Sequence, residues 1–272
     1  MRYKPSADGA DFPDVCRLSS ELREHQSDGI TDVTASSLDT QDRFHHALQE
    51  ACGRLSLEIP RQARECMFAH YTLMVQTNER VNLTRITDPA EAAVRHYADS
   101  LAVVAWIGAS GIDAALATEP QPRTLLDLGT GAGFPAVPIA IARPDVHVSA
   151  IDGTGKKVRF VQAYVGAAGL KNLAAVHTRA EAWDTTKRFS LVVARALASG
   201  ERCLKWAAPF LAAGGRIVLY KSEPMATAET SAMRRAAGRL GLVESHPYLY
   251  ELPDRGQGLP RALRIFHRAG GD

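Results

Sequence analysis

Three glycines at alternate positions, Gly129, Gly131 and Gly133, form the pattern with the clearest chemical meaning in this chain. They follow an apolar run, 124–128, that is typical of a buried strand, and an apolar segment typical of a helix, 134–142, comes next. A strand, a glycine turn and a helix form the first unit of nucleotide-binding α/β folds, in which glycine lets the backbone approach a ligand closely. The G-x-G-x-G spacing differs from the G-x-G-x-x-G pattern for a dinucleotide pyrophosphate, so it favours a ligand without pyrophosphate, with S-adenosylmethionine as the leading candidate.

An acid, Asp152, ends the second predicted strand. At this position a carboxylate can accept hydrogen bonds from the ribose hydroxyls of a nucleoside ligand. Aspartate is also a good N-cap for the helix predicted to begin at Thr154, and the two roles are compatible. The same helix carries Lys156, Lys157 and Arg159, which we interpret as a solvated face rather than a phosphate site.

Two further segments follow the third and fourth predicted strands. Ala180 and Glu181 could read the edge of an adenine ring with a backbone amide and a carboxylate, or Glu181 could simply be a first-turn acid of a helix. Arg195 directly follows the apolar strand 191–194, at the sheet edge where open α/β folds bind ligands. Because a permanently charged, planar donor is unusual there, we favour a functional role for Arg195 over an ion pair.

A predicted helix places Arg95, His96, Asp99 and Ser100 three or four positions apart, on one face. Their residue types alone predict a polar helix face with an Arg95–Asp99 ion pair. The chain has no nucleophile elbow, no H-E-x-x-H motif and no P-loop, and its four cysteines are scattered without a C-x-x-C pair. We therefore expect no metal site.

The composition is that of a soluble globular protein with a sizeable core, since 46% of the 272 residues are hydrophobic and 23% are charged. No apolar run approaches the roughly 18 residues of a membrane span, and the start of the chain lacks the apolar core of a secretory signal. Residues 1–40 carry 4 Lys and Arg against 8 Asp and Glu, which leaves 28 against 22 for the rest. This mildly basic body is compatible with RNA, although proteins that only bind nucleic acid are far more basic.

The first part of the chain is predicted to contain an extension and a helical cap. Residues 1–38 lack periodicity and are rich in Asp, Ser and Gly, which predicts a poorly ordered extension. Residues 39–107 show helical periodicity and predict a cap of helices with an irregular connector. The helices are expected to begin at Asp39, Pro60 and Asp88, and the connector spans 81–87.

Residues 108–272 alternate strands with helices, which predicts a Rossmann-like α/β domain with a mainly parallel sheet and helices on both faces. The expected strands are 124–128, 147–151, 174–177, 191–194 and 216–221. The expected helices are 134–142, 154–168, 200–211 and 226–240. Two last strands, 243–249 and 262–267, lie close together in the sequence and suggest an antiparallel end to the sheet.

Taken together, these motifs resemble the glucose-inhibited division protein B family, the small-subunit ribosomal RNA guanine-N7 methyltransferases. The resemblance covers about residues 42–268, and the combination is specific although each motif alone is weak. The segments that carry it are Asn82-Leu-Thr84, Asp88-Pro-x-Glu91, Arg95-His96-x-x-Asp99-Ser100, Asp127-Leu-Gly-Thr-Gly-Ala-Gly-Phe-Pro135, Val158-Arg-Phe160, Arg179-Ala-Glu181 and Ala194-Arg195-Ala196.

The resemblance implies a class I S-adenosylmethionine-dependent methyltransferase in the bacterial cytoplasm. It would methylate N7 of one guanine in the 16S rRNA of the small ribosomal subunit and release S-adenosylhomocysteine. We expect a monomer without a metal and without membrane association. By motif, the cofactor would contact Gly129, Gly131, Phe134, Asp152, Ala180, Glu181 and Arg195, while Asn82, Arg95 and His96 would join Arg195 at the active-site floor in positioning roles.

Three residues near the expected site depart from the family pattern. Ala136 stands where glycine is usual, Gly153 where serine is common, and Ser222 where the fifth strand typically ends in glycine. They bear on the identity of the target more than on cofactor binding.

The expected reaction needs no general base, because guanine N7 carries a lone pair and no proton. Catalysis should then rest on positioning and desolvation, which fits a chain without an obvious acid–base pair. Three alternatives remain. They are a methyltransferase of the same fold with a small-molecule or protein acceptor, a non-catalytic RNA-binding module, and a nicotinamide-dependent oxidoreductase, which the glycine spacing disfavours.

Overall fold

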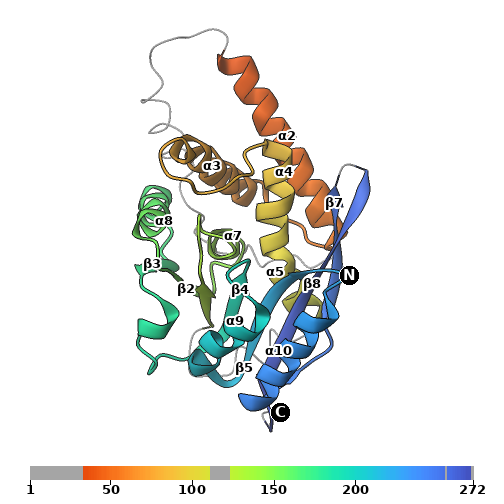
Figure 1. Cartoon of the computed structure of the whole chain (residues 1–272). Coiled ribbons are helices and arrows are strands. Elements are labelled where there is room, and N and C mark those ends of the chain that lie inside the picture. The colour runs from red at the N-terminus through yellow and green to blue at the C-terminus, as the bar shows by residue number, and fades with distance from the viewer. Residues whose placement is uncertain (1–32, 111–122, 255, 271–272) are drawn as a thin grey trace.

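The computed structural model describes residues 33–110, 123–254 and 256–270, and Figure 1 shows how their helices and strands are arranged. Most of the predicted N-terminal extension, residues 1–32, lies outside the described part of the chain. Helix α2 (Val33–Arg54) begins before the predicted start at Asp39, so the last residues assigned to the extension are helical.

An eight-stranded sheet forms the centre of the fold, in the order β3-β2-β1-β4-β5-β8-β6, with β7 pairing with β8 off this path. The parallel strands are β1 (Thr124–Leu128), β2 (His147–Asp152), β3 (Leu173–His177), β4 (Phe189–Arg195) and β5 (Leu211–Ser222). Strand β8 (Gln257–Arg268) runs antiparallel to β5, β6 (Leu242–Glu244) and β7 (Tyr248–Asp254). A mainly parallel sheet with an antiparallel end is confirmed, and it is the class I S-adenosylmethionine-dependent methyltransferase fold.

Two predicted elements near the C-terminus have different boundaries. The single strand expected at 243–249 is wrong, because residues 245–247 separate β6 from β7. Pro247 lies in this break, and proline cannot donate a ladder hydrogen bond. The helix expected at 200–211 ends at Ala207, and η3 (Ala208–Phe210), which contains Pro209, leads directly into β5.

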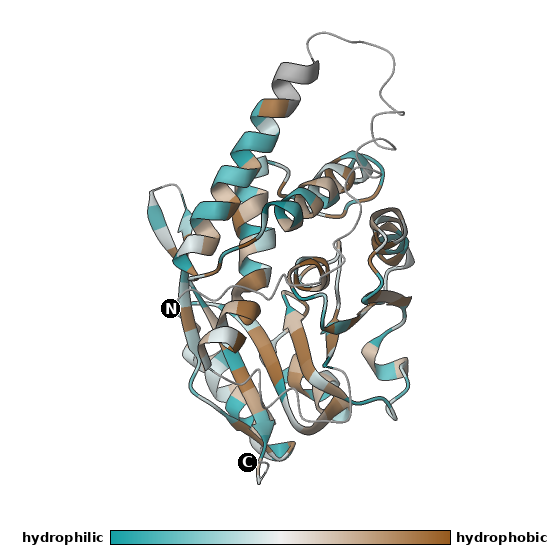
Figure 2. Cartoon of the chain, turned by 180° about the vertical axis from the view of Figure 1, so that it is seen from behind, coloured by the Kyte–Doolittle hydropathy of each residue, from teal (hydrophilic) through white to brown (hydrophobic). Residues whose placement is uncertain are grey.

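Helices cover both faces of the sheet, and successive strand residues point to opposite faces. Leu125 and Val193 belong to a core shared with the cap, whereas Leu126 and Val192 belong to a second core. Helices α7 (Ala136–Ala142) and α8 (Gly155–Ala168) contribute to the first core, and α9 (Gly200–Ala207) and α10 (Thr227–Arg239) to the second. Figure 2 shows the apolar residues concentrated on the central strands, while α2 presents many hydrophilic residues.

The cap is packed onto the sheet rather than held apart from it. It comprises α2, α3 (Arg61–Asn78) and one long helix made of α4 (Pro89–Ala92), η1 (Ala93–Ala98) and α5 (Asp99–Ser110). The Tyr220 hydroxyl of β5 donates to the Ser100 carbonyl at 2.8 Å, and the Tyr164 hydroxyl of α8 donates to the Cys66 carbonyl of α3 at 2.8 Å. None of the described helices combines the length and hydropathy that crossing a bilayer requires.

The middle of this long helix, η1, is a π-helical segment that the sequence pattern does not reveal. Segments of this kind are rare and occur frequently at functional sites. Arg95 and His96, two of the predicted site residues, both lie in it.

The start of the long helix depends on its predicted cap. The Asp88 carboxylate accepts a hydrogen bond from the Glu91 amide at 2.9 Å and pairs with Arg43 of α2 at 2.6 Å. We expect Asp88→Ala to lower the free energy of unfolding by about 1 kcal/mol, because the helix loses its N-cap. Urea denaturation measures this, with Asp88→Asn as a control that keeps the capping oxygen. Equal stability of Asp88→Ala and the wild type would contradict the assignment.

Candidate functional site

The site lies where the chain order of the sheet reverses. Strand β1 pairs with β2 on one side and with β4 on the other, and ligands of open α/β sheets bind at the carboxyl ends of strands at such a switch point. Leu128 of β1 is the register partner of Ala194 of β4. The glycine turn that follows Leu128 and the side chain of Arg195 therefore emerge next to each other.

The glycine turn adopts a backbone that other residues rarely tolerate, with φ values of 74° at Gly129, 59° at Gly131 and 96° at Gly133. A Cβ at Gly129 would lie 2.4 Å from the Leu197 side chain, and one at Gly133 would lie 2.6 Å from Val137. A Cβ at Gly131 would meet nothing within 4 Å. The turn is thus packed at both ends and open at its middle, where a ligand could reach the backbone. Helix α7 begins only at Ala136, not at Phe134 as predicted, because this turn extends to Pro135.

Asp152 holds the glycine turn and the segment before α8, but it is not the N-cap of α8, which is Thr154. One carboxylate oxygen accepts from the Thr154 amide at 2.7 Å, and the other accepts from the Gly131 amide at 2.9 Å. Since each carboxylate oxygen can accept more than one hydrogen bond, these contacts leave capacity for ribose hydroxyls. The ribose role therefore fits the geometry, whereas the predicted N-cap role is wrong, because Asp152 lies two residues before the N-cap of α8.

Ala180 and Glu181 lie in the short helix η2 (Ala180–Ala182), soon after β3 ends. The Glu181 side chain is exposed, and it makes no hydrogen bond or ion pair within the described ranges. Its carboxylate is therefore free to accept hydrogen bonds from a ligand.

Two predicted site residues from distant parts of the chain, His96 and Arg195, meet at the ring of a third, Phe134. The His96 ring stacks on it with centroids 4.7 Å apart, and the Arg195 guanidinium lies 5.4 Å from its centroid. The Thr84 hydroxyl is 2.8 Å from Nε2 of His96 and fixes the imidazole. Because Phe134 is only 6% exposed, its ring builds the wall of the site and offers a ligand little surface.

His96 is neutral at physiological pH. Burial lowers the pKa of His96 to about 3, and the nearby Arg195 charge acts in the same direction. It therefore cannot serve as an acid near pH 7, and its contribution is a fixed aromatic face and a hydrogen bond to Thr84.

Arg195 is held by a buried carboxylate from the cap helix. Its Nη1 donates to Asp99 at 3.0 Å and to the Arg95 carbonyl at 2.8 Å. Asp99 also accepts from Arg261 at 3.0 and 3.1 Å and from the Tyr250 hydroxyl at 2.7 Å. Nε and Nη2 of Arg195 make no hydrogen bond with the described residues, so two donor atoms remain for a ligand.

Charge pairing controls the protonation of Asp99. Burial alone would raise its pKa, but the Arg195 and Arg261 guanidinium groups outweigh burial and hold the pKa of Asp99 below its usual value. The predicted Arg95–Asp99 ion pair is wrong, because the Arg95 side chain pairs instead with Glu91 at 3.3 Å and Asp254 at 3.0 Å. Arg95 reaches the site through its backbone carbonyl only.

A second buried carboxylate, Asp127, lies beneath the glycine turn. It accepts from the Ala136 amide at 3.3 Å, and burial raises the pKa of Asp127 to about 7 despite this contact. The buried Thr130 hydroxyl lies close enough to Asp127 to lower the pKa of this acid, although the two side chains form no hydrogen bond of standard geometry in the described structure. This acid is thus poised between its neutral and ionised forms near physiological pH.

Asn82 does not join His96, Phe134 and Arg195. Its side chain is exposed on the connector and makes no hydrogen bond with the part of the chain that the structure describes. The connector itself is anchored, because the side-chain oxygen Oδ1 of Asn78 accepts from the amides of Leu83 and Thr84 at 2.8 and 3.0 Å. A role for Asn82 would need a ligand that reaches over the connector.

Sequence reasoning missed three residues that shape the site. Arg261 and Tyr250 complete the shell of Asp99, and His70 of α3 packs its ring against Phe134 with centroids 5.3 Å apart. Burial lowers the pKa of His70 to about 3. No local pattern marks these residues, because their partners lie far away in the sequence.

The three departures from the family pattern have different surroundings. The buried Ala136 donates its amide to Asp127, as described above. A Cβ at Gly153 would lie 3.2 Å from the flexible Arg179 side chain. Ser222 accepts from Arg261 at 2.6 Å, so this position is connected to the Asp99 cluster.

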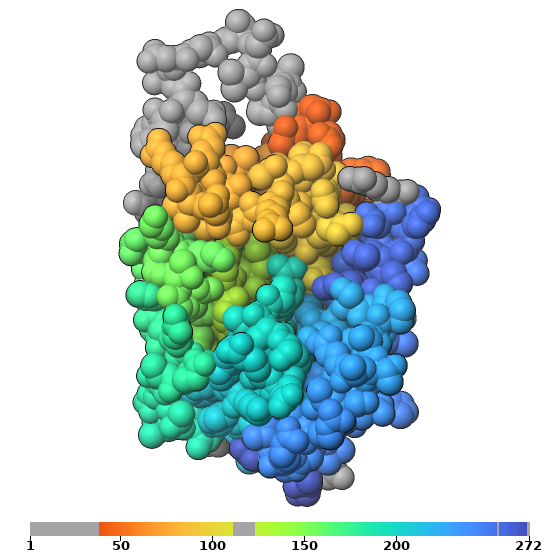
Figure 3. All heavy atoms as spheres, in the orientation of Figure 1, coloured from red at the N-terminus to blue at the C-terminus, as the bar shows by residue number. Residues whose placement is uncertain are grey.

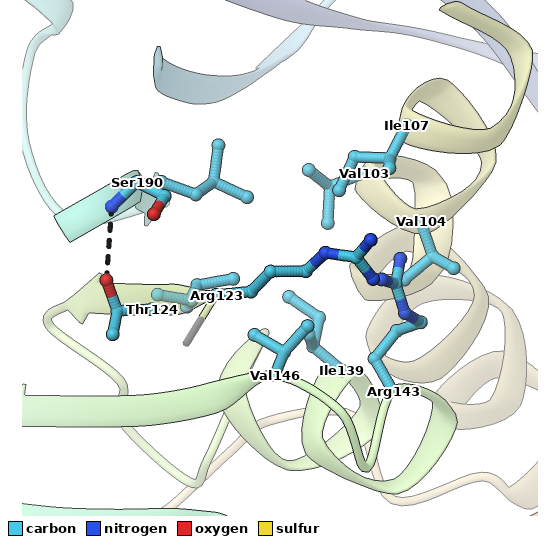
Figure 4. A pocket seen from close by; sticks show the side chains of 11 residues that line it. Val103, Val104, Ile107, Arg123, Thr124, Ile139, Arg143, Val146 and Ser190 are labelled. Atoms are coloured by element: carbon cyan, nitrogen blue, oxygen red, sulfur yellow. Dashed lines mark hydrogen bonds between the residues drawn. The ribbon is translucent and has the colours of Figure 1, made fainter. Parts of the chain in front are cut away.

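A separate small pocket lies at the opposite edge of the sheet, where β1 and β4 begin (Figure 4). Its volume is about 20 Å³, and its lining is mostly apolar. Arg123 and Arg143 border it and bind Asp145 at 2.5 and 2.7 Å. Burial alone would raise the pKa of Asp145, but the two arginines outweigh burial and lower this pKa to about 2. No predicted site residue lines this pocket.

The chain is similar to known proteins in sequence and, more distantly, in structure. A sequence model of the GidB family, rRNA small subunit methyltransferase G, matches residues 64–246. The ribosomal RNA small subunit methyltransferase G of Solibacter usitatus is 42% identical over 68% of this chain and 82% of its own length. The Myxococcus xanthus protein of that name is 32% identical over 82% of this chain and 97% of its own. The crystal structure of ribosomal protein L11 methylase from Lactobacillus delbrueckii aligns with 68% of this chain and 88% of its own, at 16% identity and a TM-score of 0.45.

The buried contacts of Asp99 with Arg195, Arg261 and Tyr250 predict that its substitution has a strong and pH-dependent effect on stability. We expect Asp99→Asn to lower the free energy of unfolding by about 3–5 kcal/mol at pH 7, because it leaves Arg195 and Arg261 without their buried anion. The folded-state pKa of Asp99 is depressed, so its stabilisation is present above the unfolded pKa of about 4 and is lost as pH falls through the folded pKa.

Urea denaturation of both proteins between pH 7 and pH 3 measures this difference. Glu201→Gln is the matched control, because Glu201 pairs with Lys205 and Arg239 at the surface and its loss should scarcely change stability. A stability difference for Asp99→Asn that stays constant as pH falls would contradict the pairing.

Proposed function

Because the chain belongs to the rRNA small subunit methyltransferase G family, we propose that it transfers a methyl group from S-adenosylmethionine to N7 of one guanine in 16S rRNA. The small ribosomal subunit in the cytoplasm is then its substrate. The observation that carries the proposal is the meeting of the open glycine turn, Asp152 and Arg195 at one switch point of the sheet.

The residues around the glycine turn fit S-adenosylmethionine. The open space at Gly131 lets a ligand approach the backbone, and the carboxylates of Asp152 and Glu181 can accept from ribose hydroxyls and from the adenine amino group. Gly129, two residues before Gly131, and Ala180, directly before Glu181, would also contact the cofactor. When bound, S-adenosylmethionine supplies a sulfonium methyl group that guanine N7 attacks directly.

Arg195 and the groups around it suit the target base. Nε and Nη2 of Arg195 can donate to guanine O6 or to a phosphate, and Asp99 and the Arg95 carbonyl fix the direction of the guanidinium. Neutral His96 adds no positive charge beside a ring that becomes cationic on methylation. These residues position and desolvate the base, and none needs to move a proton, since N7 carries none.

Transfer of labelled methyl groups tests the proposed function. Radiolabelled S-adenosylmethionine is incubated with the protein and with small subunits or 16S rRNA that lack the modification, and the RNA is digested to nucleosides. We expect label in 7-methylguanosine at a single site. Intact cofactor binding without label in RNA would overturn the RNA substrate and favour another acceptor.

The role of Glu181 can be tested without RNA. We expect Glu181→Ala to weaken S-adenosylmethionine binding by about tenfold, because the ligand loses a charge-assisted hydrogen bond worth roughly 1.5 kcal/mol. Isothermal titration calorimetry measures the affinity. Glu79→Ala is the control, since Glu79 is also an exposed acid but lies on the cap. Unchanged affinity of Glu181→Ala would remove this residue from the site.

A further inference from the structure

The exposed Lys and Arg side chains of this protein differ in whether they have a partner. Most described Lys and Arg side chains are neutralised by acids, as in the pairs of Arg54 with Glu50 and Lys221 with Glu229, or bind backbone carbonyls or aromatic rings. A small group does none of these within the described residues. Its exposed members are Arg80, Arg85, Lys156, Arg159, Arg179 and Lys171. Arg235 is also exposed and forms no salt bridge or hydrogen bond with the described residues, but its charge lies close enough to Glu201 to lower the pKa of that acid.

Arg80 and Arg85, which we call the connector pair, lie on the cap close to the glycine turn. They flank Thr84, whose hydroxyl binds His96, and His96 stacks on Phe134 directly after the turn. Hydrogen bonds from the connector amides to Asn78 hold the backbone between them. The two cations are therefore presented by a fixed segment and not by a loose loop.

Lys156, Arg159 and Arg179, which we call the α8 cluster, lie on the other side of the turn. Helix α8 begins just after Asp152, which binds the Gly131 amide, and the Arg179 side chain lies over Gly153. Because α3 packs against α8, the connector pair and the α8 cluster have a defined separation.

Figure 3 shows both segments on one face of the molecule. The chain around the glycine turn, in yellow-green, is set back there between the orange to yellow cap above and the green surface of α8 beside it. Two exposed acids without partners among the described residues, Glu79 and Glu181, lie next to Arg80 and two residues after Arg179 in the sequence, so the cations outnumber the acids in these segments. Lys171 precedes β3 at the opposite edge of the sheet, and Arg235 lies on α10.

We propose that the connector pair and the α8 cluster bind backbone phosphates of the RNA on two sides of the target guanine. For Lys156 and Arg159 this replaces the solvated face that their sequence pattern favours. This inference rests on the proposed function and assigns the surface that holds its substrate. Unpaired cations attract a polyanion more strongly than cations already neutralised by carboxylates, and each phosphate contact releases counterions from the RNA. The cap is thus part of the RNA-binding surface.

The test compares three double variants of the full-length protein, each of which removes two exposed cations that form no salt bridge or side-chain hydrogen bond within the described ranges. Arg80→Ala with Arg85→Ala removes the connector pair, and Lys156→Ala with Arg159→Ala removes two members of the α8 cluster. Lys171→Ala with Arg235→Ala is the matched control at distant positions. Binding to unmodified 16S rRNA transcribed in vitro is measured at several salt concentrations, and S-adenosylmethionine affinity and melting temperature are measured alongside.

The slope of log affinity against log salt is negative. We expect its magnitude to decrease by about 1.5 for each of the first two variants, since each phosphate contact contributes roughly 0.7–0.9. The control should keep the wild-type slope, and all variants should keep the wild-type cofactor affinity. Arg80→Lys with Arg85→Lys should restore binding, because a point charge suffices for a phosphate contact.

Equal slopes for the connector variant, the α8 variant and the control would overturn the proposal. The outcome is independent of the proposed reaction, because binding is measured without methyl transfer. Wild-type protein that binds the rRNA with the expected salt dependence but transfers no methyl group to RNA would contradict the proposed function and leave the assigned surface intact.

Discussion

A carboxylate buried away from water must be matched by cations and hydrogen-bond donors, and Asp99 meets this need with Arg195, Arg261 and the Tyr250 hydroxyl. These partners come from β4, β8 and β7, whereas Asp99 begins α5. One anion therefore links the cap helix to β4 and to the antiparallel end of the sheet. Loss of this anion would free Arg195 and leave two cations unpaired in the interior.

The site is assembled from both parts of the chain. The sheet supplies the glycine turn and Asp152, and the cap supplies His96 and the carbonyl that orients Arg195. The π-helical segment η1 lies at this junction and carries His96. Because cap and sheet share one apolar core, the positions of these groups are set by packing as well as by hydrogen bonds.

The positions of most strands and the glycine turn could be predicted from sequence because their signals are local, namely apolar runs, glycine spacing and the acid that ends β2. The partners of Asp99 could not be predicted, since residues four positions apart on a helix suggested Arg95 while the actual partners lie about 100 or more positions away. The break between β6 and β7 was missed for a different reason. A single proline, Pro247, interrupts a stretch that is otherwise typical of a strand.

A double-mutant cycle between Asp99 and Arg195 tests the central claim that the buried carboxylate acts on the reaction by positioning the guanidinium. Methyl transfer to 16S rRNA is measured as kcat/KM for the wild type, Asp99→Asn, Arg195→Ala and the double variant, at a temperature where all four are folded. The account predicts that Asp99→Asn causes little further loss once Arg195 is gone. Losses that multiply in the double variant would show that the two residues act independently and would contradict it.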